Sequence, residues 1–242
     1  MTDQQIPEIL KPVLESGVIE ADEVSTLRRW FYGDGLLHRE DAEGLFQVQA
    51  RLGGCCAGFN RLFVEAITDF VVYQNLPTGK VTAEQADWLI SQLGGPEAVV
   101  ETKVELDLLL QVLEEAHAIP ASLAAFALSQ VRHAAITGEG PAASGRVHFS
   151  RTVDAGDIAL LTRILDGARG PTGIAVSRAE ADILFDIADA CQDGQNDGAW
   201  DVLFTRAIAS HMIGPTGAER SVIANEVAAL LTRLHTRGLL ET

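Results

Sequence analysis

The sequence predicts an all-α protein made of two repeated antiparallel helical-bundle units, on three observations. Apolar residues recur at spacings of three and four along most of the chain, as they do on one face of an α-helix. No stretch alternates between apolar and polar residues for long enough to indicate a β-strand. One pattern of helices recurs about 140 residues further along the chain. Of the 242 residues, 47% are hydrophobic, which is enough apolar material for a buried core.

Helical periodicity is clearest in the segment 58–74, whose apolar face consists of Phe59, Leu62, Phe63, Ala66, Ile67, Phe70 and Val71. Similar stripes mark other helices, and in chain order they are Val24, Leu27, Trp30 and Phe31; Ala86, Leu89, Ile90 and Leu93; Leu106, Leu109, Leu110 and Leu113; Ile158, Leu161, Ile164 and Leu165; and Val227, Leu230, Leu231 and Leu234. The spacing predicts helices over 5–15, 20–33, 39–52, 58–74, 82–94, 101–117, 120–136, 154–167, 178–192 and 199–213, with one more near 217–236.

Two of these helices begin with the signature of a capping box, in which a hydroxyl residue is followed three positions later by Glu or Gln. Thr82 with Gln85 is one, and Ser177 with Glu180 is the other. We therefore interpret Glu180 as a capping residue and not as a ligand.

The internal repeat aligns three segments of the first half with three of the second. Residues 23–29 match 157–163, residues 39–46 match 178–185, and residues 59–71 match 200–212. The glycine-rich stretch 138–145 is the natural joint. We therefore divide the chain into a unit over 1–137, a linker over 138–145 and a shorter unit over 146–242.

The charge of the chain narrows the class of partner. Its 34 acidic and 18 basic residues give a net charge of −16, and residues 1–137 hold 20 acidic and 9 basic side chains. Such a surface repels phosphate backbones, which argues against nucleic acid and favours a protein partner, self-association or a cation. No secretory signal and no apolar run of ~20 residues is present, so we expect a cytoplasmic protein without a membrane span.

Cysteine and histidine are sparse and fit structural roles. Cys55, Cys56 and Cys191 lie in no zinc spacing, and we expect reduced thiols, with Cys191 on an apolar helix face. His211 occupies the stripe position that Phe70 holds in the first half. We expect its ring to be buried with a local hydrogen-bond partner.

The sequence resembles the TerB-like family of tellurite-resistance and stress-response proteins at Asp34-Gly35-Leu36, followed by Glu40 or Asp41. An Asp-Gly, an aliphatic residue and then an acidic residue opening a helix are the hallmark of that family. The second half has Thr172 before Gly173 instead of an aspartate. The resemblance implies an all-α fold of paired helical hairpins, an acidic surface, and a role in stress response that involves a divalent cation or a partner. The internal repeat gives two copies in tandem, whereas a single domain is usual in the family.

Four carboxylates form the predicted metal site. Glu65 and Asp69 are spaced i, i+4 on one helix, and Asp34 and Asp41 bracket the start of the preceding helix. Oxygen ligands of this kind suit calcium or magnesium. The second half has Arg206 and Ser210 in place of Glu65 and Asp69, so the site belongs to the first half alone.

Two other metal patterns are incomplete. The loop 193–198 resembles the start of an EF-hand but has Phe204 at the position of the bidentate glutamate, so we interpret Asp197 as a helix N-cap. Glu114 and His117 have the spacing of a di-iron motif, which a di-iron bundle needs twice.

No phosphate loop, nucleophile elbow or zinc-protease motif is present, and no catalytic residues are predicted. The sequence therefore favours a non-catalytic acidic module that binds a protein partner or a divalent cation. The alternative is a metal-dependent enzyme with carboxylate and histidine ligands from separate helices.

Overall fold

A computed structural model describes residues 8–33, 37–53, 56–74, 76–146, 151–169 and 176–213. These residues contain ten α-helices and no strand, which confirms the all-α prediction. The α-helices are α1 (Lys11–Ser16), α2 (Ala21–Phe31), α3 (Arg39–Leu52), α4 (Ala57–Thr68), α5 (Ala83–Gln92), α6 (Lys103–Glu115), α7 (Ala121–Thr137), α8 (Ala155–Arg169), α9 (Arg178–Ala190) and α10 (Ala199–Ile213). The short elements are the 3-10 helices η1 (Glu8–Leu10) and η3 (Pro141–Ala143), and the π-helical turn η2 (Asp69–Tyr73) that continues α4. The helix predicted near 217–236 lies outside the described residues.

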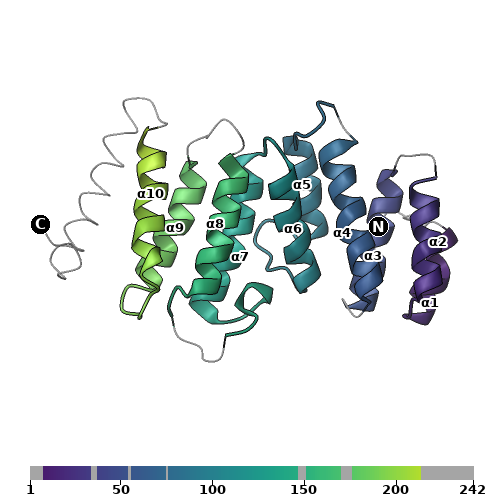
Figure 1. Cartoon of the computed structure of the whole chain (residues 1–242), viewed down its shortest axis with the longest axis horizontal. Helices are drawn as coiled ribbons and strands as arrows, with labels where there is room; N and C mark the ends of the chain where they lie inside the picture. The colour runs from purple at the N-terminus through teal and green to yellow at the C-terminus, as the bar shows by residue number, and fades with distance from the viewer. Residues whose placement is uncertain are drawn as a thin grey trace, which may run out of the picture.

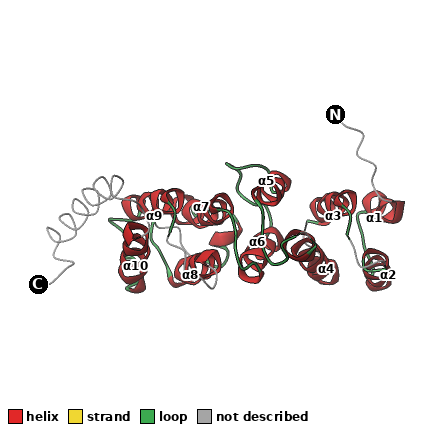
Figure 2. Cartoon of the chain, turned by 90° about the horizontal axis from the view of Figure 1, so that it is seen from above, coloured by secondary structure: helices red, strands yellow, loops and turns green. Residues whose placement is uncertain are grey.

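The helices stand side by side in two layers along the long axis of the molecule (Figure 1). Seen from above in Figure 2, the odd-numbered helices form one row and the even-numbered helices form the other. Each helix contacts its successor or its neighbour in the same row, and the most extensive contact joins α7 and α9. Helical pairs that are stacked in line, each touching mainly its neighbours, form a solenoid type of architecture.

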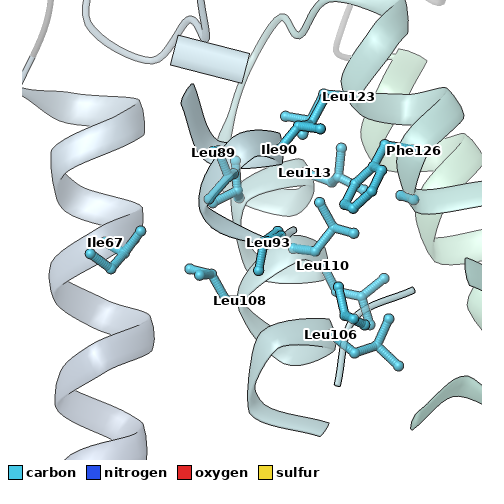
Figure 3. Packing of buried hydrophobic residues seen from close by; sticks show 14 of the residues in the cluster. Ile67, Leu89, Ile90, Leu93, Leu106, Leu108, Leu110, Leu113, Leu123 and Phe126 are labelled. Atoms are coloured by element: carbon cyan, nitrogen blue, oxygen red, sulfur yellow. The ribbon is translucent and has the colours of Figure 1, made fainter. Parts of the chain in front are cut away.

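One apolar core runs between the two layers from η1 to α10. Figure 3 shows its centre, where side chains of α5, α6 and α7 and of Leu93, which directly follows α5, point toward one another; those of the helices include Leu89, Ile90, Leu110, Leu113, Leu123 and Phe126. The side chains of α5 and α6 in this set belong to stripes predicted from spacing, because a helix in a two-layer stack buries the face that meets the other layer. Trp30, which belongs to the stripe predicted for α2, is instead 45% exposed.

Capping boxes open many of the helices. They are present at α2, α3, α5, α6 and α9, and Asp154 and Asp157 form the same reciprocal pair at α8. A buried apolar residue directly precedes most of these caps: Ile19, Leu37, Val81, Val153 and Val176. An apolar residue before the cap that packs on the first helical turn sets the angle at which the chain enters the helix.

The predicted linker 138–145 connects α7 to the second half. Gly138 ends α7 in the left-handed conformation with a φ of 73°, which glycine adopts without strain. The core continues past the linker, because α6 and α7 both contact α8. The division of the chain into two domains stays a prediction.

The helices that the repeat pairs occupy matching layers. The alignment relates α2, α3 and α4 to α8, α9 and α10, and Figure 2 shows each helix in the same row as its counterpart. The superposition of the two halves, and their relation to TerB-like bundles, stay predictions.

Candidate functional site

The predicted site residue Glu65 forms an ion pair between α4 and α2. Arg28 Nη1 and Nη2 donate to Glu65 Oε1 and Oε2, both at 2.7 Å. The hydrogen bond to Glu65 raises the pKa of the Arg28 guanidinium. Burial raises the pKa of the neighbouring Tyr32 hydroxyl to about 12, and the charges of Glu65 and Asp69 add to that rise. The ion pair between Arg28 and Glu65, which we call the clasp, thus joins α2 to α4.

Asp69 and Asp41 also accept hydrogen bonds from the protein. Asp69 Oδ2 accepts from Gln74 Nε2 at 2.7 Å. Asp41, only 7% exposed, is the acidic member of the α3 capping box, and its Oδ2 accepts from the His38 backbone N–H at 3.1 Å. Asp34 lies outside the described residues. A cation at this site would share these three described carboxylates with hydrogen-bond donors of the protein.

The described ranges contain no group of three or more His, Cys, Asp and Glu side chains arranged to hold a metal ion. The calcium or magnesium site at Asp34, Asp41, Glu65 and Asp69 stays a prediction, and so does the alternative of a metal-dependent enzyme.

The two incomplete metal patterns have structural roles. Glu114 Oε1 accepts from Arg163 Nε of α8 at 2.7 Å, whereas His117 lies beyond the end of α6 and its backbone N–H donates to Gly79 O. Asp197 Oδ1 accepts from the backbone N–H of Ala199 at 2.9 Å, which confirms the N-cap interpretation.

The structural roles predicted for Cys191, His211 and Glu180 are confirmed. Cys191 is fully buried, and burial raises the pKa of its thiol, so little reactive thiolate is present near neutral pH. His211 is 6% exposed, and its Nδ1 lies 2.7 Å from the carbonyl oxygen of Val176. Glu180 Oε2 accepts from the Ser177 backbone N–H at 2.8 Å, as a capping residue does.

The best candidate for a ligand site is a pocket on the odd-numbered layer, which we call the α3–α5 pocket. Its volume is about 350 Å³, which falls within the range of small-ligand pockets. It is lined by Arg39, Phe70, Leu76, Thr82, Glu84, Gln85 and Trp88.

Trp88 is held rigidly in the wall of this pocket. Its ring packs edge-on against Phe70 and Phe46, with centroid separations of 5.1 and 5.9 Å. Glu43 Oε1 accepts from Trp88 Nε1 at 3.3 Å and from Arg39 Nε at 3.1 Å. The Arg39 guanidinium lies over the indole, 5.9 Å from its centroid. The pocket therefore presents a fixed aromatic surface with a cation at its edge.

The lining of the pocket mixes polar and apolar side chains, and one of the apolar ones is strongly exposed. Leu76 is 89% exposed, which is unusual for a large aliphatic side chain beside an aromatic pocket. In the preceding turn Tyr73 is 40% exposed, and its hydroxyl donates to Glu115 Oε2 at 2.6 Å. The aromatic wall can hold an apolar group. Among the described residues that line the pocket, Glu84 is the one carboxylate, and no histidine or cysteine is present.

The pocket exists because α3 and α5 make only sparse contact, whereas α5 packs along α7. Figure 2 shows α5 displaced from the line of its row.

Sequence reasoning missed the site because Phe70 and Trp88 are on helices, where aromatic residues indicate core. The available signal was Leu76, an apolar residue in a turn-rich segment between two predicted helices.

The chain matches no protein-family model, and comparisons with curated proteins and with solved structures find no match either. The TerB-like resemblance stays a prediction. None of the described helices combines the length and the apolarity that crossing a membrane requires.

Proposed function

We propose that this protein is a non-catalytic helical-repeat module, whose α3–α5 pocket binds an apolar side chain of a partner protein. One observation carries the proposal: Leu76, 89% exposed, stands beside a pocket wall formed by Trp88 and Phe70. Exposed apolar residues around a preformed aromatic pocket are typical of sites that anchor a partner's side chain.

The charge of the protein favours a partner segment with a basic surface. The net charge of −16 attracts positively charged proteins from a distance and repels nucleic acid. Within the pocket, Glu84 supplies a carboxylate and Arg39 is already paired with Glu43. We therefore expect an aromatic or aliphatic anchor flanked by lysine or arginine.

Selection from a displayed peptide library tests this proposal. We expect the wild-type protein to enrich peptides with one apolar anchor and flanking basic residues, and Leu76→Glu to weaken their binding about tenfold, or ~1.4 kcal/mol, because a charge replaces the apolar rim. Val18→Glu is the matched control, since Val18 is 60% exposed and lies outside the pocket. Equal binding to the wild type and to Leu76→Glu would contradict the proposal.

A further inference from the structure

A second groove lies in the even-numbered layer, between α8 and α10. Its volume is about 280 Å³ and its lining is mainly apolar, formed by Ile158, Thr162, Leu165, Asp166, Ala199, Val202, Leu203 and Arg206. Val202 is 70% exposed on the wall of the groove. The apolar lining and the exposed valine give this groove the character of a contact surface that is independent of the α3–α5 pocket.

The seam between α2 and α4 is the counterpart of this groove in the first half. The repeat aligns Arg28 with Thr162 and Glu65 with Arg206. In the first half Arg28 and Glu65 clasp the two helices through two hydrogen bonds of 2.7 Å. In the second half both replacements line the open groove. Compared with the first half, the second half therefore lacks the arginine on the first of the two helices, where Thr162 stands. It has an arginine, Arg206, on the other helix, where the first half has a glutamate.

Arg206 has no partner for its charge within the described part of the chain. Its side chain is exposed and takes part in no hydrogen bond, ion pair or ring contact there. Asp166, the carboxylate on the opposite wall, takes part in another interaction. An unpaired guanidinium at the edge of an apolar groove is suited to recognise a carboxylate on an incoming segment, because arginine binds carboxylates in a bidentate manner.

We propose that the α8–α10 groove binds an amphipathic helix of a partner protein, which places an apolar side chain on Val202 and Leu203 and a carboxylate on Arg206. Arg206 stands at the position of Glu65, so the ligand carboxylate would pair with it from the side on which Arg28 pairs with Glu65 in the first half.

Charge distinguishes this occupant from a second copy of the chain. A protein with a net charge of −16 repels its own copies, and it attracts a helix whose outward face is basic. The partner helix thus carries an acidic residue only beside its apolar stripe. This local match to Arg206 gives specificity, while the basic face speeds association.

A displayed library of helical peptides of about 18 residues, roughly five turns, is the probe. The positions beside a leucine stripe are randomised and the outward face carries lysine. We expect the wild-type protein to select Asp or Glu at one position beside the stripe. Arg206→Glu should select Lys or Arg at that same position, and Arg206→Gln should select neither.

Selected peptides are then measured individually against full-length protein. Replacing their Glu by Gln should weaken binding to the wild type about tenfold, and Arg206→Gln should remove that difference. Arg178→Gln is the matched control, since Arg178 is an exposed arginine on the neighbouring helix α9. Val202→Glu should abolish binding, and circular dichroism melting should show that these surface variants remain folded.

A rebuilt clasp gives a second readout. Thr162→Arg combined with Arg206→Glu should restore the Arg28–Glu65 arrangement, raise the melting temperature above that of Arg206→Glu alone and close the groove to peptide.

Four outcomes would overturn the proposal. In the first, the wild type selects no helix, and in the second the same residues are selected whichever side chain stands at position 206. Binding that Leu76→Glu abolishes would place the peptide in the α3–α5 pocket instead. Self-association in sedimentation that Arg206→Gln removes would assign the groove to a second copy of the chain.

Discussion

Arg146 and Asp157 form an ion pair that is almost completely removed from water. Their side chains are 9% and 1% exposed, and Arg146 Nη2 donates to Asp157 Oδ2. The same oxygen accepts from the Asp154 backbone N–H at 3.0 Å, whereas Asp157 Oδ1 is buried without a hydrogen-bond partner. Burial raises the pKa of Asp157, although Arg146 and the hydrogen bond from the backbone act in the opposite direction. Arg146 thus stabilises the charged form of this carboxylate against the effect of burial.

Arg146→Met should destabilise the protein strongly at neutral pH and less at acidic pH. Removing one partner of a buried pair costs about 3–5 kcal/mol, because the other charge stays buried. The pKa of Asp157 is higher in the folded protein than its unfolded value of ~3.9, so the native state binds a proton at a higher pH than the unfolded state does. Protonation removes the buried charge. The cost of losing Arg146 therefore falls as the pH is lowered.

Urea unfolding of the wild type and of Arg146→Met at two pH values measures this effect. The difference in unfolding free energy between the two proteins should shrink from pH ~7 to pH ~4.5. Adding Asp157→Asn to Arg146→Met removes the titrating group and should remove the pH dependence of the difference. A cost that is the same at both pH values would contradict the prediction.

The predicted cation site leads to a second prediction at the scale of single residues. Calcium or magnesium bound by Glu65 and Asp69 should raise the melting temperature, by the equivalent of ~2.7 kcal/mol at one hundred times Kd. The double variant Glu65→Gln with Asp69→Asn should lose that response. Sodium chloride at equal ionic strength is the control for charge screening. Equal shifts in all three salts would leave Glu65 with its ion pair to Arg28 and no site.

At the scale of the element, capping explains why helix starts were predicted well. The helices predicted over 39–52 and 199–213 have those bounds in the structure. Both the apolar stripe and the cap are local, so spacing along the chain contains the necessary information. The partner of a surface charge, in contrast, can lie on another helix far away in the sequence, where spacing does not reveal it. Glu65 pairs with Arg28 on another helix, and the i, i+4 relation of Glu65 to Asp69 contains no information about that contact.

Ser177→Ala should destabilise the protein by about 1 kcal/mol, the usual cost of losing an N-cap hydroxyl. Ser177 Oγ accepts from the Glu180 backbone N–H at 3.3 Å, and this bond would be lost. Ser177→Asp keeps an acceptor and should retain most of the stability. Thermal and urea unfolding would measure both, and an equal loss in the two variants would show that the cap contributes little.

At the scale of the whole molecule, the two halves of the chain are joined by a close contact that no sequence pattern revealed. Gly167 of α8 approaches α6 so closely that an added Cβ would lie 2.8 Å from the carbonyl oxygen of Leu113. This contact crosses the predicted boundary at 138–145. The sequence shows Gly167 only as a helix-weakening glycine, because the neighbour that requires it is more than fifty positions away in the chain.

Gly167→Ala should therefore destabilise the protein even though alanine favours a helix. Alanine in place of a helical glycine gains up to about 1 kcal/mol of intrinsic propensity. Here the new methyl group would meet rigid backbone, and relieving such overpacking costs about 1–3 kcal/mol. Gly58→Ala in α4 is the matched control, since its added Cβ would make only ordinary contact with Val24, at 3.9 Å. We expect urea unfolding to show a loss for Gly167→Ala and no loss for Gly58→Ala. If both variants were equally stable, α8 could move away from α6 at little cost, and the two halves of the chain would be loosely coupled.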